Sequence, residues 1–191
     1  ADGTRRKALQ EILRTRVRCG QIDVNIMTKV DRNLYGKDGR VLPDEFSDGL
    51  AGLRGFARSN LENSSIVFSA GFNRRLYSYI EKFDDFFPDE NGNVKKRVIL
   101  KVSDFRSSMT QGKFLAKKGV WVSEHRIESG LNCGGHVFAT EGLILGPILE
   151  EFKEHKQEML RSLLGICNET LVKRGRKPYR QIPTTRVTVQ G

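Results

Sequence analysis

Two histidines, a cysteine and three glycines fall within fourteen residues of one segment, residues 125–138, which reads HRIESGLNCGGHVF. Three side chains here, His125, Cys133 and His136, are of the types that bind zinc. A thiol next to a histidine also suits a nucleophile, and glycine N–H groups suit an anion. A turn that merely packs a small thiol is the fourth interpretation. We favour the anion cradle, and the other three stay open.

The cradle hypothesis needs only backbone and a nearby cation. Glycine lets the backbone approach a ligand closely, although the segment is not a G-x-G-x-x-G motif. A lysine within the apolar run VILKVSD, Lys101, is the candidate cation; alternatively it reaches solvent or pairs with Asp104 or Glu128. The candidate contacts in the segment itself are Ser129, Gly130, Gly134 and Gly135.

The elements that must position these residues alternate between strand-like and helix-like patterns. The apolar runs that predict strands are QIDVNIMTKV (21–30), SSIVFSAG (64–71), KRVILKVSD (96–104), KKGVWVSEH (117–125) and TTRVTVQG (184–191). The patterns that predict helices are EFSDGLAGLRGFARSNL (45–61), NRRLYSYIEKFDDFF (73–87), RSSMTQGKFLAKKG (106–119) and LGPILEEFKEHKQEMLRSLLGICNETLVKRG (145–175).

Apolar strands separated by amphipathic helices predict an α/β fold with a parallel sheet. A complete (β/α)8 barrel usually needs about 250 residues, whereas this chain has 191. We therefore expect one α/β domain over residues 1–191, and favour part of a larger TIM-type barrel over an open doubly wound sheet. In such a piece, an edge strand is left open or pairs with another chain.

Ligands of parallel α/β sheets bind at the carboxyl ends of the strands. The residues expected there form a polar, partly cationic rim, and we expect four of them, Asp31, Lys101, His125 and Gly191, at one common edge. The rim comprises Thr28, Lys29, Asp31, Ser69, Gly71, Asn73, Lys101, Ser103, Asp104, Ser123, Glu124, His125, Arg126, Gln190 and Gly191.

The composition of the chain limits the classes of partner and the location to be expected. A formal net charge of +10 suits an anionic ligand, but the basic residues are scattered and no aromatic residues interleave with them, so nucleic acid is not expected. No apolar run is long enough to span a membrane and the first residues lack a secretory signal, which predicts a cytoplasmic protein. The three cysteines form no C-x-x-C pair, so neither a disulfide framework nor a four-cysteine zinc site is expected.

The second half of the chain resembles the FMN-binding barrel domain of glutamate synthases. The resemblance rests on the order of LKVSD, SEHRIESGLNCGGH, a long helix and VTVQG, over residues 97–191. The glycine turn carries Cys133 and is longer than in that family, no cysteine cluster for an iron–sulfur centre is present, and residues 1–93 have no counterpart. The resemblance implies FMN, with these residues near cofactor or substrate: Lys101, Ser103, Gly134, Gly135, Gln190 and Gly191.

The leading functional hypothesis is thus an FMN-dependent oxidoreductase of the glutamate-synthase-like barrel type, or a non-redox relative with the same ligand face. In the enzyme, Lys101 would stabilise negative charge and His136 would donate or accept a proton. The alternative hypothesis is a non-catalytic binding or scaffold domain whose basic surface recruits an anionic partner. Expected partners are a small anionic ligand or cofactor and either a second copy or a partner domain.

Overall fold

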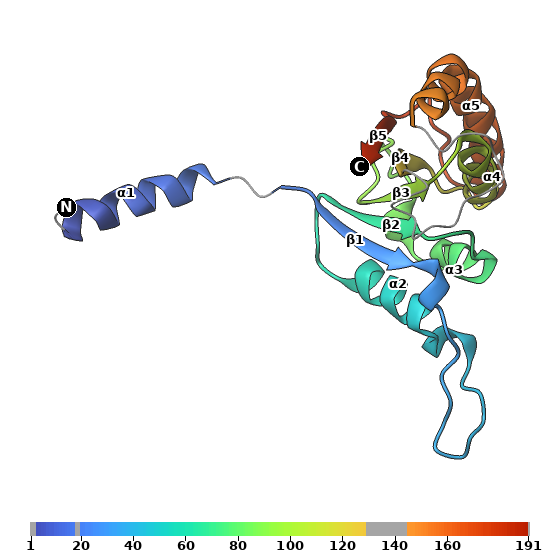
Figure 1. Ribbon diagram of the computed structural model, residues 1–191, viewed down its shortest axis with the longest axis horizontal. Coiled ribbons are helices and arrows are strands. Elements are labelled where there is room, and N and C mark those ends of the chain that lie inside the picture. The colour runs from blue at the N-terminus through green and yellow to red at the C-terminus, as the bar shows by residue number, and fades with distance from the viewer. Residues whose placement is uncertain (1–2, 18–19, 129–144, 191) are drawn as a thin grey trace.

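The computed structural model describes residues 3–17, 20–128 and 145–190, which form a five-stranded sheet covered by helices (Figure 1). All neighbouring strands are parallel and follow one another in chain order. The α/β fold with a parallel sheet, expected from the sequence, is therefore confirmed. The strands are β1 (Ile22–Met27), β2 (Ser64–Ser69), β3 (Lys96–Val102), β4 (Val122–Glu128) and β5 (Arg186–Gln190).

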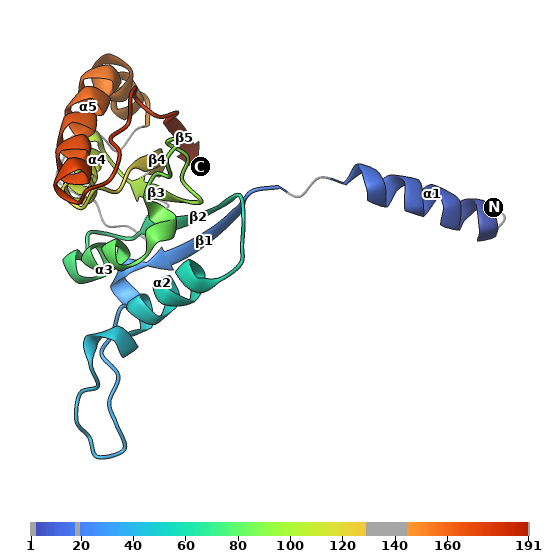
Figure 2. The same ribbon diagram turned by 180° about the vertical axis from the view of Figure 1, so that it is seen from behind.

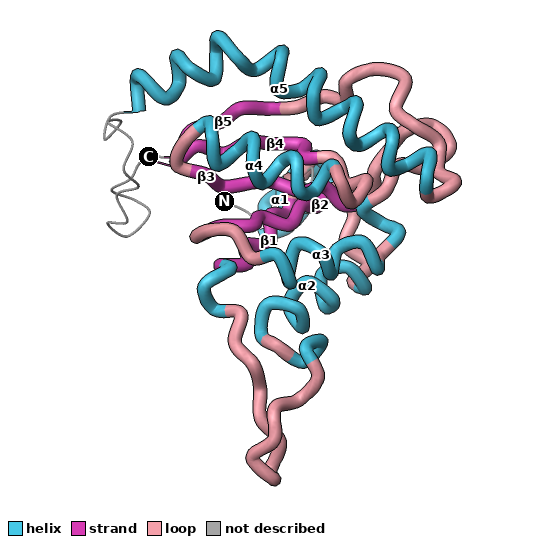
Figure 3. The backbone as a smooth tube through the Cα atoms, turned by 90° about the vertical axis from the view of Figure 1, so that its right-hand side faces the viewer, coloured by secondary structure: helices cyan, strands magenta, loops and turns pink. Residues whose placement is uncertain are grey.

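Four of the described helices pack on one face of the sheet, as Figure 3 shows with these helices in front of the strands. They are α2 (Asp48–Arg58), α3 (Arg74–Tyr79), α4 (Phe105–Ala116) and α5 (Leu145–Lys173). Short 3-10 turns cover Thr28–Val30, Asp44–Phe46, Ile80–Lys82 and Asp84–Phe86. A further helix, α1 (Gly3–Arg16), has no buried residue and extends away from the sheet (Figures 1 and 2).

One row of side chains across the sheet marks the helix-covered face. The row is Ile26, Phe68, Leu100, His125 and Val187, which are register partners from β1 to β5. Helices contact this row directly: the ring of Tyr77 in α3 stacks on Phe68 at 4.6 Å between centroids. Because side chains alternate along a strand, the neighbouring positions point to the opposite face.

Two observations indicate that the opposite face is concave. The first is that two apolar side chains at its centre are buried, although no described helix covers them. Val67 and Ile99 are 2% and 1% exposed. An ion pair also crosses this face: Arg126 Nη2 on β4 lies 2.9 Å from Asp23 Oδ2 on β1, with β2 and β3 between them. Strands lie about 4.8 Å apart, so curvature brings these two strands within reach of each other's side chains.

The element bounds differ from the expected ones mainly at β4. The apolar run 117–125 predicts a strand that ends at His125, whereas β4 begins at Val122 and continues to Glu128. Four residues expected to follow the strand therefore lie inside it: Ser123, Glu124, His125 and Arg126. The expected helix at 73–87 is shorter as well, since α3 ends at Tyr79 and is followed by 3-10 turns.

Among the described residues, the sheet is open, and its two edge strands are β1 and β5. An open edge is what part of a larger barrel was expected to have. Among the described residues, no helix has both the length and the apolar character that crossing a membrane requires.

Candidate functional site

The face of the sheet that no described helix covers, called the polar face below, carries most of the polar side chains of the strands. Its members come from all five strands and lie in register. Its polar members are Asp23, Asn25, Ser65, Ser69, Arg97, Lys101, Glu124, Arg126, Glu128, Arg186, Thr188 and Gln190.

Arg126 is the centre of a network that ties β1, β4 and β5 together. Its Nε donates to Glu124 Oε1 (2.7 Å) and its Nη2 donates to Asp23 Oδ2 (2.9 Å). Thr188 Oγ1 donates to the same Glu124 oxygen at 2.7 Å. Burial acts to raise the pKa of Asp23, but hydrogen bonds from Arg126 and Gln21 outweigh it and hold that pKa below its ordinary value. Asp23 and Arg126 therefore stay charged at neutral pH, and the network links three strands across the polar face.

Lys101 lies close to the carboxyl end of β3 and points onto the polar face. Its Nζ donates to Glu128 Oε1 on β4 at 3.0 Å, and only 13% of its side chain is exposed. Of the two carboxylates that the sequence offers as partners, Asp104 and Glu128, the observed one is Glu128. A shielded lysine–carboxylate pair at this edge can bind an anionic group or exchange a proton with a ligand.

A strained turn follows β2 at the same edge of the sheet. Ala70 has φ 58° and Gly71 has φ 112°, a conformation that residues other than glycine rarely adopt. Thr28 Oγ1 holds the turn through the carbonyl groups of Ala70 (3.1 Å) and Gly71 (3.0 Å). Within the described part of the chain, the N–H groups of Gly71 and Phe72 have no backbone acceptor. Strained turns of this kind occur at ligand sites, where their N–H groups bind anions.

A short hydrogen bond links β1 and β2 beside this turn. Ser69 Oγ donates to Asn25 Oδ1 at 2.7 Å, so the amide of Asn25 keeps its two N–H donors for other partners. The carboxyl ends of β1, β2 and β3 thus present an amide, a strained turn and a lysine together.

Asp31 follows β1 as expected, but its contacts are structural. Its side chain is fully buried and accepts hydrogen bonds from Gly49 N, Asn73 Nδ2 and Arg75 Nη2 at 2.8 to 3.2 Å. These bonds join the end of β1 to the starts of α2 and α3. Because residues of the protein already donate hydrogen bonds to its carboxylate, Asp31 stabilises this edge of the sheet and is not expected to contact a ligand.

Ser103 and Gln190 lie at the expected edge. Ser103 Oγ donates to Asp104 Oδ2 (2.8 Å), and Asp104 Oδ1 accepts from Ser107 N (2.7 Å) to cap the start of α4. Gln190, the last residue of β5, is exposed on the polar face opposite Glu128. Gln190 is therefore the more accessible of the two.

The position expected for His125 is wrong. Its ring lies in the middle of β4 on the helix-covered face, fully buried, with Nδ1 2.5 Å from Ser108 Oγ of α4. Burial, with a smaller contribution from the charge of Lys156, lowers the pKa of His125 to about 4. The described residues thus enclose this imidazole under α4, in the middle of the strand and not at the carboxyl ends of the strands.

Most of the glycine-rich segment lies outside the described residues. The predictions that fall there concern Ser129, Gly130, Cys133, Gly134, Gly135 and His136, and Gly191 also lies outside.

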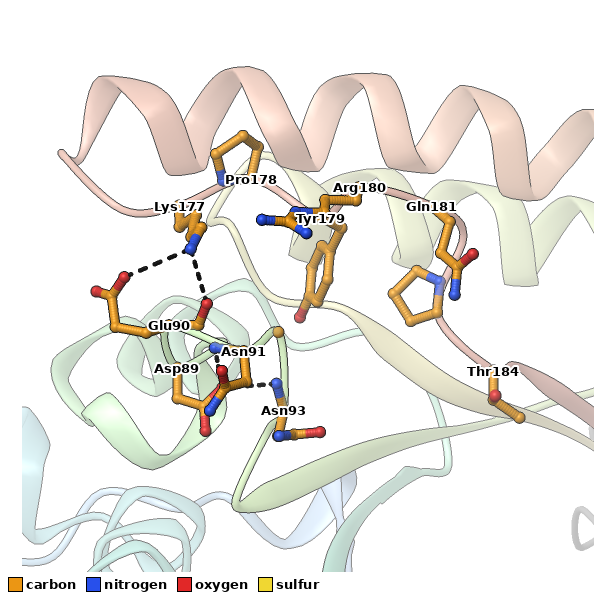
Figure 4. A pocket seen from close by; sticks show the side chains of 12 residues that line it. Asp89, Glu90, Asn91, Asn93, Lys177, Pro178, Tyr179, Arg180, Gln181 and Thr184 are labelled. Atoms are coloured by element: carbon orange, nitrogen blue, oxygen red, sulfur yellow. Dashed lines mark hydrogen bonds and ion pairs between the residues drawn. The ribbon is translucent and has the colours of Figure 1, made fainter.

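A large pocket lined by described residues lies at the opposite end of the sheet (Figure 4). Its volume is about 620 Å³, and its walls are two segments that precede strands, residues 89–93 before β3 and residues 177–184 before β5. Lys177 Nζ bridges the walls by donating to the carbonyl of Glu90 at 2.9 Å. Since the amino ends of parallel strands serve stability in α/β proteins, we place the functional site at the carboxyl edge despite the size of this pocket.

At the sequence level Asn25 and Ala70 were missed, and Arg126 and Gly71 were expected on the rim, but not as the network centre and as part of a strained turn. The signal for Arg126 is present, because Glu124, Arg126 and Glu128 alternate with His125 and Ile127 at the period of a strand. No local signal marks Ala70, since alanine does not favour its backbone conformation.

Comparison of the chain with protein-family models, with curated proteins and with solved structures gives no match.

Proposed function

We propose that the chain is part of a TIM-type β/α barrel that binds an anionic cofactor or substrate at the carboxyl edge of the polar face. We propose further that the ligand is FMN and that the domain belongs to an oxidoreductase of the glutamate-synthase-like type. Two observations support the barrel: the strands follow chain order, and the described helices that cover the sheet lie on one face only. A doubly wound sheet reverses its strand order and carries helices on both faces.

The observation that carries the ligand proposal is the position of Lys101. Its ammonium is shielded from water, lies near the carboxyl end of a central strand and is held by Glu128. A shielded cation interacts with an anion more strongly than one in bulk water. In the part of the chain that the structure describes, the side-chain N–H groups of Asn25 and the backbone N–H of Gly71 have no acceptor; they lie on or just after neighbouring strands and suit the oxygen and nitrogen acceptors of a flavin.

In this proposal, FMN supplies the hydride acceptor when it is bound. The chain would bind the cofactor and supply charge to it. Lys101 would offset negative charge on the reduced ring or on the substrate, and Glu128 holds the ammonium group of Lys101 in position. The Arg126 network keeps the polar face rigid. A proton-transfer role for His136 stays a prediction.

Replacing Lys101 tests the proposal. We expect Lys101→Met to weaken FMN binding about tenfold or more, since about 1.4 kcal/mol accompanies the loss of one charge-assisted contact. Quenching of flavin fluorescence during titration measures the affinity. Because the substitution also removes the ammonium that Glu128 contacts, the double variant Lys101→Met/Glu128→Gln separates loss of the cation from the effect of the remaining carboxylate charge.

The matched control is Lys95→Met, which removes a half-exposed lysine just before the same strand, at its other end. It should bind FMN like the wild type, with both proteins checked for folding by circular dichroism. Wild-type protein that does not bind FMN, or equal affinity in all variants, rules the flavin proposal out and favours the non-catalytic alternative.

A further inference from the structure

Two edges of the sheet expose backbone and apolar side chains together. Ile22 N donates to the carbonyl of Asn63 beside β2, so the alternation of a parallel strand directs the backbone groups of Asp23, Asn25 and Met27 to the open edge. Ile22 on β1 is 44% exposed and Val189 on β5 is 47% exposed, and both lie on the helix-covered face. An open apolar edge of this kind favours pairing with another strand.

Helix α1 stands directly before a strand, as the other helices do, but it does not pack on the sheet. Each of the strands β2 to β5 follows a helix that packs on the sheet, and α1 precedes β1 in the same way. Three apolar residues of α1 at helical spacing are nevertheless exposed: Leu9 by 52%, Ile12 by 47% and Leu13 by 61%. In a parallel β/α arrangement, this stripe would cover the strand that pairs with β1.

The charges of α1 match those of a helix at the other edge. Among its residues, five are basic and one is acidic. Near the β5 edge, the first half of α5 exposes four glutamates, namely Glu150, Glu151, Glu154 and Glu158, and carries two lysines, Lys153 and Lys156, so its net charge is negative. If the β5 edge of one copy met the β1 edge of another, the basic helix α1 would lie beside this half of α5.

We propose that a second copy of this chain adds its β5 edge, in parallel, to the open edge of β1, and that α1 covers the added strand. A two-fold axis repeats the contact, so that both open edges of both copies are paired. The two polar faces then line one enclosed space. This interface does not depend on the identity of the ligand.

Mass measurement in solution tests the proposal first. Size-exclusion chromatography with light scattering should give twice the 21.7 kDa of one chain at micromolar concentration. A monomer over the whole accessible concentration range overturns the proposal, whatever the result of the flavin titration.

Two variants then locate the interface. Leu13→Asp places a carboxylate in the proposed contact and should weaken the dimer about tenfold or more, since a buried unpaired charge is costly. Met27→Pro removes one N–H from the open edge, at a residue whose φ of −73° already suits proline. Neither change removes a contact within the fold that the described residues show: Leu13 lies in a helix without buried residues, and Met27 is 49% exposed.

The control is Val41→Asp, which introduces the same carboxylate at a 53% exposed apolar residue on the loop that projects from the sheet after β1 (Figure 1). It should leave the dimer intact. A dimer that survives both Leu13→Asp and Met27→Pro uses another surface, and that result also overturns the proposal.

Discussion

Lys96→Met is expected to lower the free energy of unfolding by about 3–5 kcal/mol, the usual cost of removing one partner from a buried charged cluster. Lys96 is fully buried, and its Nζ donates to the carbonyl groups of Phe56 (2.8 Å), Ala57 (2.7 Å) and Ser59 (2.7 Å). These carbonyls end α2, where a positive charge also interacts favourably with the helix dipole. The same ammonium lies 3.1 Å from Asp85 Oδ2. The substitution leaves all four acceptors without this donor.

Urea unfolding followed by circular dichroism measures this effect. The control is Lys95→Met, at the neighbouring lysine, which also reaches Asp85 (3.2 Å) but is 52% exposed. Since exposed ion pairs contribute about 0–1 kcal/mol, the control should stay within about 1 kcal/mol of the wild type. Similar losses in the two variants would mean that the buried contacts of Lys96 are not what stabilises the end of α2.

The contrast between Lys96 and Lys101 shows how far the sequence leads. Both flank the apolar core of one strand, and an odd spacing of five residues places them on opposite faces. The sequence alone does not reveal which face the helices cover, because the residues between the two lysines are mostly apolar. Lys101 was a candidate because it lies near the carboxyl end of a predicted strand. The structural role of Lys96 could not be predicted, because it depends on carbonyl groups about forty residues earlier in the chain.

The fold class was predictable because it depends on local patterns. Short apolar runs and amphipathic helices alternate along the chain, and such an order favours parallel strands. The end of β4 was not predictable from hydrophobicity alone, because polar residues alternate into the polar face from Glu124 onward. A strand whose second half faces a polar, concave surface looks like a loop when only continuous apolar runs are counted.

The candidate site was predictable in part for the same reason. The rule that ligands bind at the carboxyl ends selects Lys101, Ser103 and Gln190 once the strands are assigned. The Arg126–Asp23 contact depends on the curvature of the sheet, which brings β1 and β4 together across two strands. Curvature is a property of the assembled sheet, so no single segment of the sequence predicts this pair.

The buried histidine of β4 predicts a marked pH dependence of stability. The pKa of His125 is about 4 in the folded protein, because of burial and then the nearby Lys156, against an ordinary value of 6.5 that applies to the unfolded chain. Between these values the unfolded chain binds more protons, so the free energy of unfolding falls as the pH decreases from 6.5 to 4. The total loss is about 3 kcal/mol, since each unit of pKa difference corresponds to about 1.4 kcal/mol. Above pH 6.5 this contribution is fully present.

Comparing His125→Phe with the wild type isolates this contribution, because the carboxylates with lowered pKa values, such as Asp23 and Asp85, destabilise both proteins equally in acid. Urea unfolding at intervals from pH 7 to pH 4 should show a steeper loss in the wild type, with the two curves differing by about 3 kcal/mol more at pH 4 than at pH 7. A His155→Gln variant, at a half-exposed ring on α5, should follow the wild-type curve. Parallel curves for the wild type and His125→Phe would show that the imidazole is not held neutral by its enclosure between β4, α4 and α5.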